Sequence, residues 1–160
     1  KAGMASADLT EQVTRLMAAL NRTAAEVMAR FAVHACTDVT GFGLLGHLAE
    51  MVSGSGRSAR VYAERIPVIE DALAFAAMGL IPGGAYKNRE FRAGMVEAAE
   101  GVARAREDIL FDPQTSGGLL ISVPEAQAEA LVAALKDAGL GDAAEIGEVL
   151  DDAAEKIRVA

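Results

Sequence analysis

Residues 35–47 read ACTDVTGFGLLGH, and this stretch carries most of the information about the fold. The residues up to Val39 lack helical spacing and predict an extended segment, while Thr40 to Gly43 predict a glycine turn. The apolar residues from Leu44 to Val52 are spaced as one face of a short helix. An extended segment, a glycine loop and a helix are therefore expected to follow one another here.

The flanking sequence predicts a mixture of helices and strands. Helical spacing over 9–20 and 24–31 predicts two helices, or one that bends near Asn21. Further helices are expected over 68–78, 94–109 and 124–138, strands over 59–66, 119–123 and 145–150, a long loop over 79–91, and an acidic tail after 150. Because strands and helices do not alternate strictly, the sequence predicts a single α+β domain over residues 1–160, with one mixed β-sheet and helices packed on it.

The composition is that of a globular protein. Of the 160 residues, 52% are apolar and 24% are charged, and no apolar run reaches the roughly 18 residues that a membrane span needs. The single cysteine, Cys36, excludes an internal disulfide and fits a reducing compartment, so we expect a cytoplasmic protein in which Cys36 is buried. The chain begins with Lys1 rather than Met, which predicts that it is part of a longer protein.

The charge balance bears on possible partners. The net charge is −8, and the chain holds no Trp and only two Tyr. A protein that binds nucleic acid usually carries a basic surface with stacking aromatic side chains, so neither nucleic acid nor a membrane is an expected partner. An anionic small substrate would need a local cation.

The glycines of the opening stretch also match a dinucleotide-binding turn. Gly41, Gly43 and Gly46 have the spacing G-x-G-x-x-G, a helix is predicted to follow, and Glu64 lies about 20 residues further on. That turn requires a buried apolar strand before the first glycine. Here the preceding residues include the carboxylate of Asp38, which is costly to bury without a partner, so the sequence disfavours a dinucleotide site.

Two interpretations of Asp38 remain. Asp38 and Thr40 can simply cap the helix or satisfy the turn. Alternatively, Asp38 projects from the strand end beside free backbone N–H groups, where a carboxylate can hold Mg²⁺ while the amides face phosphate oxygens.

Two further polar clusters follow. Residues 112–118, DPQTSGG, form either a plain turn or a nest of backbone amides for an anion. Residues 82–89, PGGAYKNR, supply local positive charge and are interpreted as a solvated connection. His34 and His47 lack metal-ligand spacing and are expected to pack or to form hydrogen bonds.

The amino-acid sequences of these segments resemble those of one enzyme family. VHACTDVTGFGLLGHLAEM (33–51) and DPQTSGGLLISV (112–123) closely resemble the signature stretches of selenophosphate synthetase, also called selenide, water dikinase. IPGGAYKN (81–88) is similar to that family's Pro-Gly-Gly loop with its following Asn, and LNRTAAEVM (20–28) is similar to its preceding helix.

The resemblance implies a carboxy-terminal domain of the aminoimidazole ribonucleotide synthetase (PurM-like) superfamily, with an α/β/α layered fold. Such an enzyme makes selenophosphate from selenide, ATP and water, releases AMP and phosphate, uses Mg²⁺ and works as a homodimer. The resemblance assigns Asp38 as a magnesium ligand at the ATP phosphates. The residues expected near the nucleotide phosphates are Thr37, Thr40, Gly41, Gly43, Asp112, Gln114, Thr115 and Ser116.

The family's amino-terminal domain, with its reactive Cys or selenocysteine and catalytic Lys, has no counterpart in this sequence. No catalytic residue is therefore expected within this chain, which should be inactive alone. Two alternatives stay open: a related synthetase or kinase with another substrate, and a non-catalytic domain that docks a partner or its own amino-terminal half.

Overall fold

The computed structural model describes residues 3–160 and begins with two helices. Helix α1 spans Ala7–Ala18, and the hydroxyl oxygen of Ser6 caps it by accepting a hydrogen bond from the Leu9 N–H at 3.1 Å. Helix α2 spans Arg22–Met28. The expected interruption near Asn21 is confirmed, and it separates two helices rather than bending one.

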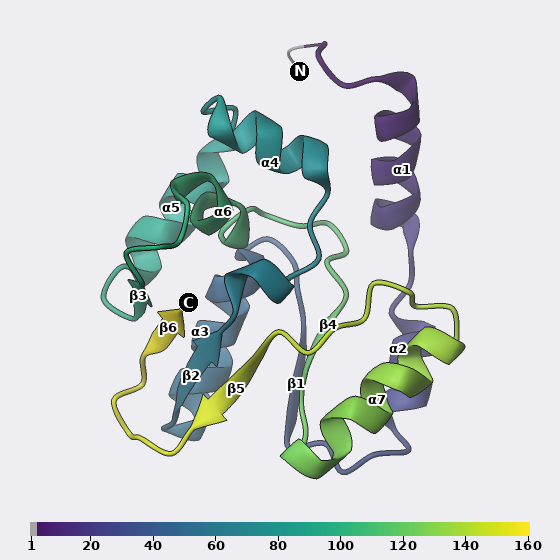
Figure 1. Ribbon diagram of the computed structural model, residues 1–160, viewed down its shortest axis with the longest axis vertical. Coiled ribbons are helices and arrows are strands. Elements are labelled where there is room, and N and C mark those ends of the chain that lie inside the picture. The colour runs from purple at the N-terminus through teal and green to yellow at the C-terminus, as the bar shows by residue number, and fades with distance from the viewer. Residues whose placement is uncertain (1–2) are drawn as a thin grey trace.

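Two sheets form the β-structure (Figure 1). Strand β1 (Ala35–Asp38) pairs antiparallel with β4 (Leu119–Ser122) in a two-stranded ladder. The second sheet has the order β3-β6-β2-β5, with β3 at Val96–Ala98, β6 at Ile157–Val159, β2 at Ser58–Val61 and β5 at Gly147–Leu150. Strand β6 is parallel to both neighbours, whereas β5 is antiparallel to β2. The α+β class is confirmed, but the strands divide between two sheets where one was expected.

The main core lies between helix α3 (Gly43–Ser55) and the four-stranded sheet. Leu45 and Ala49 of α3 are fully buried, as is Ile157 of β6. Helices α5 (Gly83–Arg92) and α6 (Arg104–Leu110) contribute buried residues to the same core. A smaller cluster joins α2 to α7 (Glu125–Asp137) through Val27, Leu131 and Leu135.

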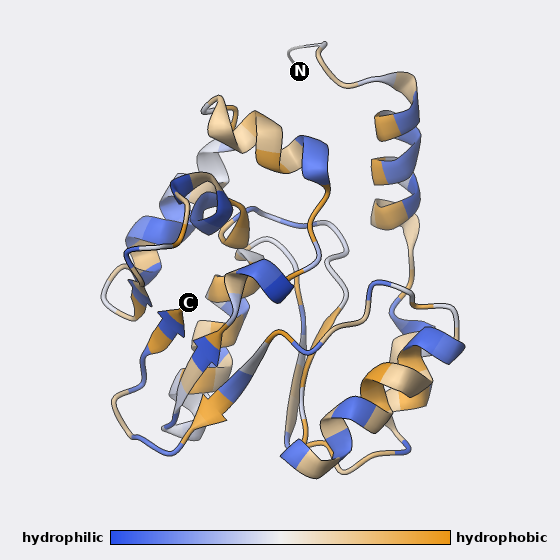
Figure 2. Ribbon diagram, viewed as in Figure 1, coloured by the Kyte–Doolittle hydropathy of each residue, from blue (hydrophilic) through white to orange (hydrophobic). Residues whose placement is uncertain are grey.

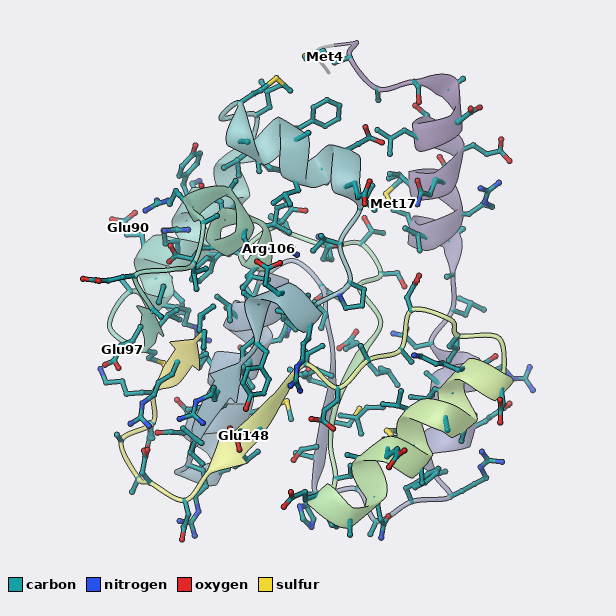
Figure 3. All side chains as sticks on the ribbon, viewed as in Figure 1. Met4, Met17, Glu90, Glu97, Arg106 and Glu148 are labelled. Atoms are coloured by element: carbon teal, nitrogen blue, oxygen red, sulfur yellow. The ribbon has the colours of Figure 1, made fainter. Side chains whose placement is uncertain are left out.

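The other face of the four-stranded sheet carries a row of charges. In register across the strands lie Glu97, Arg158, Arg60 and Glu148. Arg60 donates a hydrogen bond to Glu148 at 2.7 Å, and Figure 3 labels Glu97 and Glu148 at the two ends of the row. Since charged residues face outward and apolar residues face α3, the sheet is buried on one face.

Three sequence predictions were wrong in the second half of the chain. Most of the loop expected over 79–91 is helix α5. Before it lie a short 3-10 helix at Ala63–Arg65 and helix α4 at Glu70–Ala77. The single helix expected over 94–109 is instead β3 followed by α6. The expected acidic tail contains β6, a central strand of the sheet.

Helix α1 stands beside α4 and leaves an apolar groove between them. Figure 2 shows the apolar residues of α1 on the side turned toward α4. The groove is lined by Leu9, Val13 and Met17 of α1 and by Ile69, Ala72 and Phe75 at α4.

Within residues 3–160, no helix is long and apolar enough to span a lipid bilayer.

Candidate functional site

Asp38 is the last residue of β1 and its side chain is exposed. Within residues 3–160, no hydrogen bond or ion pair engages its carboxylate. The neighbouring Thr37 is partly buried, and its hydroxyl donates to the Asp38 carbonyl oxygen at 3.1 Å. The carboxylate at the strand end is therefore available to a cation, and it does not cap helix α3, whose N-cap residue is Phe42.

The two polar clusters predicted from the sequence lie side by side. The first loop (residues 39–43) continues the β1–β4 pairing into the second loop (residues 111–118). The Val39 N–H donates to the Gly118 carbonyl at 3.0 Å, and the Gln114 N–H donates to the Thr40 carbonyl at 3.0 Å. The structure thus brings Thr40, Gly41 and Gly43 next to Asp112 and Gln114; their role in binding stays a prediction.

Gly43 makes the close approach of the two loops possible. Its φ is +71°, in the left-handed region that residues with a side chain rarely adopt. A Cβ at this position would lie 2.7 Å from the Phe111 carbonyl carbon and 3.0 Å from the Asp112 carbonyl oxygen. Only glycine lets the start of α3 lie against the backbone of the second loop.

The Thr40 side chain forms a hydrogen bond with a buried histidine. The Thr40 hydroxyl lies 3.1 Å from Nε2 of His47, a residue that is 6% exposed. The His47 Nδ1 is buried without a hydrogen-bond partner and lies 3.5 Å from a carboxylate oxygen of Glu50. The prediction that His47 packs and forms a hydrogen bond is confirmed.

Asp112 is a partly buried carboxylate in the second loop. Loss of solvent raises its pKa above the usual 3.8, although the side-chain hydrogen bond from Gln114 acts in the opposite direction. That bond joins Gln114 Nε2 to Asp112 Oδ2 at 2.7 Å. The carboxylate is therefore kept in a place that disfavours its charge, an arrangement that is common at functional sites.

This burial predicts a pH-dependent effect of replacing Asp112 by asparagine. Below pH 3.8 the Asp112 carboxyl is protonated in both the folded and the unfolded protein, and its raised folded-state pKa contributes fully to the free energy of unfolding. This contribution is lost as the pH rises through the raised pKa. We expect Asp112→Asn to unfold at higher urea concentration than the wild type at pH 7, with the difference shrinking toward about pH 3.5. Urea titrations at several pH values measure this, with the exposed Asp142→Asn as control; an equal difference at all pH values would contradict it.

The remaining predicted residues of the second loop differ in their contacts. Thr115 is exposed. Ser116 is partly buried, and its hydroxyl donates to the Ala19 carbonyl at 2.8 Å, which ties the second loop to the end of α1. The Ser116 hydroxyl therefore has a structural partner in this structure.

Cys36 corrects a sequence expectation. The residue is exposed rather than buried, because it lies on β1 in a ladder of only two strands. Partial desolvation of its sulfur and the nearby Asp38 charge both raise the pKa of the thiol. A raised pKa lowers the thiolate fraction, so Cys36 is not set up as a nucleophile.

Sequence reasoning missed the role of α5 beside the loops. Asn88 of this helix donates to the Gly41 carbonyl and to the Phe111 carbonyl, each at 3.0 Å. The Pro-Gly-Gly stretch favoured a loop, although a proline at the start of a helix is common because its missing N–H is not needed there. That proline, Pro82, is the signal that could have predicted the helix.

Asp38 offers one exposed carboxylate to a metal ion. In the part of the chain that the structure describes, no group of three or more His, Cys, Asp or Glu side chains could hold a metal ion. Mg²⁺ is commonly held by one or two carboxylates together with substrate phosphates, without a complete protein cage. The Asp38 carboxylate beside exposed backbone fits a magnesium ion shared with a phosphate group.

Comparison with known protein families gives a match over nearly the whole chain. The family model described as AIR synthase related protein, C-terminal domain, matches residues 4–160. The chain belongs to this family. Among solved structures, hydrogenase maturation protein HypE resembles this AIR synthase related chain with a TM-score of 0.53 and 25% identity, over 82% of this chain and 33% of that one.

Three curated relatives of this chain are selenide, water dikinases. The selenide, water dikinase of Pelobacter propionicus is 58% identical over 99% of this chain. The selenide, water dikinase 2 of Peptoclostridium acidaminophilum is 43% identical over 99%, and the selenide, water dikinase of Myxococcus xanthus is 46% identical over 93%. The chain spans 46%, 46% and 43% of these three relatives, slightly less than half of each.

Proposed function

We propose that this chain is the C-terminal half of a selenide, water dikinase, which makes selenophosphate from selenide, ATP and water with release of AMP and phosphate. The observation that carries the proposal is the 58% identity with the Pelobacter propionicus selenide, water dikinase over 99% of the chain. In this proposal the chain contributes to the Mg-ATP site and holds no catalytic residue of its own.

Asp38 is the proposed magnesium ligand. Its carboxylate is exposed at the strand end and lies next to the first loop. Asp38 would hold the ion, which would supply positive charge to neutralise the phosphates of ATP. Thr37 and Thr40 flank this position, with the Thr40 hydroxyl oriented by His47.

The backbone of the first loop is the proposed contact for phosphate. Gly41 and Phe42 are exposed, and their N–H groups have no protein acceptor within residues 3–160. Free amides next to the start of helix α3 favour an anion, because the partial positive charge at a helix N-terminus adds to their own. Asp112, Gln114, Thr115 and Ser116 would lie beside the same phosphate site, on the second loop.

The rest of the active site is proposed to lie on an N-terminal domain. Phosphoryl transfer from ATP requires several cations around the triphosphate, whereas Asp38 supplies a single carboxylate for a metal and the net charge of the chain is −8. The relatives are more than twice as long as the matched part. We infer that the preceding domain supplies the reactive Cys or selenocysteine, the catalytic Lys and further metal ligands, and that the whole protein is a cytoplasmic homodimer.

The direct assay follows ATP turnover by the full-length protein. With Mg²⁺ and selenide we expect AMP and phosphate, and little nucleotide product when selenide is omitted. A related synthetase or kinase would turn over ATP with another acceptor but not with selenide. A docking domain would leave the full-length protein without any ATP turnover that depends on this chain.

A further inference from the structure

Helix α5 contacts both site loops through one face. Gly84 and Asn88 lie one turn apart, so they point to the same side of the helix. The Asn88 side-chain amide has two N–H donors. One donates to the Gly41 carbonyl in the first loop and the other to the Phe111 carbonyl in the second, each at 3.0 Å.

The two carbonyls that Asn88 binds flank the proposed ligands. Gly41 follows Asp38 by three residues and immediately follows Thr40, while Phe111 immediately precedes Asp112. Phe111 is 1% exposed, so its carbonyl is fixed in the core of the domain. Asn88 therefore ties the first loop to a rigid part of the second.

Gly84 provides a second and independent contact. A Cβ on Gly84 would lie 2.7 Å from Cγ of Pro113, which means that the first turn of α5 lies directly against the second loop. Ion pairs fix helix α5 to helix α6, since Arg89 of α5 is paired with Glu107 and Asp108 of α6. Because α5 is fixed by these ion pairs, its contacts through Gly84 and Asn88 can fix the positions of both loops.

We propose that Asn88 is a positioning residue of the metal-phosphate site: it sets the distance between the loop that follows Asp38 and the loop that carries Asp112. Asn88 acts through backbone carbonyls and does not reach the reacting atoms. This inference rests on the proposed function. It implies that Asn88 affects the binding of Mg-ATP more than it affects the overall stability of the fold.

The test compares Asn88→Ala and Asn88→Asp with Ser58→Ala in the full-length protein. Ser58 is fully buried at the start of β2, where its hydroxyl contacts Asp152 and accepts from the Lys156 N–H at 3.1 Å. Ser58→Ala therefore removes buried hydrogen bonds without touching the loops. Asn88→Asp keeps the shape of the side chain but removes both donors and places an anion against two carbonyl oxygens.

For Asn88→Ala we expect the KM for Mg-ATP to rise about tenfold, with a smaller change in kcat. Asn88→Asp should raise the KM for Mg-ATP further than Asn88→Ala does. Ser58→Ala should lower the melting temperature while leaving the KM unchanged. Equal KM values in Asn88→Ala and Ser58→Ala would overturn the proposal.

Amide hydrogen exchange separates this proposal from the proposed function. In Asn88→Ala, exchange should become faster in residues 39–43 and 111–118 and stay unchanged in the four-stranded sheet. A wild-type protein without selenide-dependent ATP turnover would refute the proposed function but leave this measurement valid. Wild-type exchange rates in both loops of Asn88→Ala would overturn the role of Asn88.

Discussion

Replacing Asp38 by asparagine is expected to lower selenide-dependent AMP formation by the full-length protein at least about a hundredfold. Asn is nearly the same shape but carries no charge, so it cannot neutralise a magnesium ion at the triphosphate. No hydrogen bond or ion pair engages the Asp38 carboxylate within residues 3–160, so the substitution should leave the urea midpoint almost unchanged. Steady-state rates over a range of Mg²⁺ concentrations measure the effect.

Asp142→Asn is the matched control for Asp38→Asn. Asp142 is exposed in the loop after α7, and its substitution makes the same change in net charge. Its activity should equal that of the wild type. If Asp38→Asn retained wild-type activity at every Mg²⁺ concentration, Asp38 would have no part in the metal site.

Replacing Gly43 by alanine is expected to destabilise the domain by about 2–4 kcal/mol. The left-handed backbone at φ +71° is unfavourable for alanine, and its Cβ would lie 2.7 Å from the Phe111 carbonyl carbon. The two loops must move apart to accommodate it, so Mg-ATP binding should weaken as well. Urea unfolding at pH 7 measures the loss of stability.

Gly54→Ala, in the same helix, is the control for Gly43→Ala. Gly54 lies near the end of α3 with an ordinary helical backbone, and a Cβ added there would meet no atom of another element within 4 Å. Alanine has the higher helix propensity, so Gly54→Ala should be neutral or up to about 1 kcal/mol more stable. Equal effects of the two substitutions would contradict the close-approach role of Gly43.

The order of strand, glycine turn and helix around Asp38 could be predicted because each part depends on local sequence. The helical spacing of Leu44, Leu45, Leu48 and Val52 is clear, and α3 begins at Gly43. The α+β class followed from the same local patterns. The juxtaposition of the first and second loops could not be derived from them, because it depends on the pairing of β1 with β4, far apart in the sequence.

The errors came from elements whose partners are distant. Val96–Ala98 becomes a strand because β6 offers it a parallel edge, a contact that a segment of three residues does not reveal. Cys36 was expected to be buried, yet the ladder of β1 and β4 leaves its side chain exposed. Asn88 was missed as a contact residue because its acceptors lie 47 and 23 residues away.

A chimera in which this chain replaces the matching part of the Pelobacter propionicus selenide, water dikinase tests the proposed function most directly. The 58% identity over 99% of the chain makes a folded product the expected result. If this chain supplies the C-terminal half of the Mg-ATP site, the chimera should form AMP from ATP in a selenide-dependent reaction within about tenfold of the parent enzyme. Asp38→Asn in the chimera should lower this activity at least about a hundredfold. A folded chimera that forms no AMP with selenide would refute the assignment of this chain to a selenide, water dikinase.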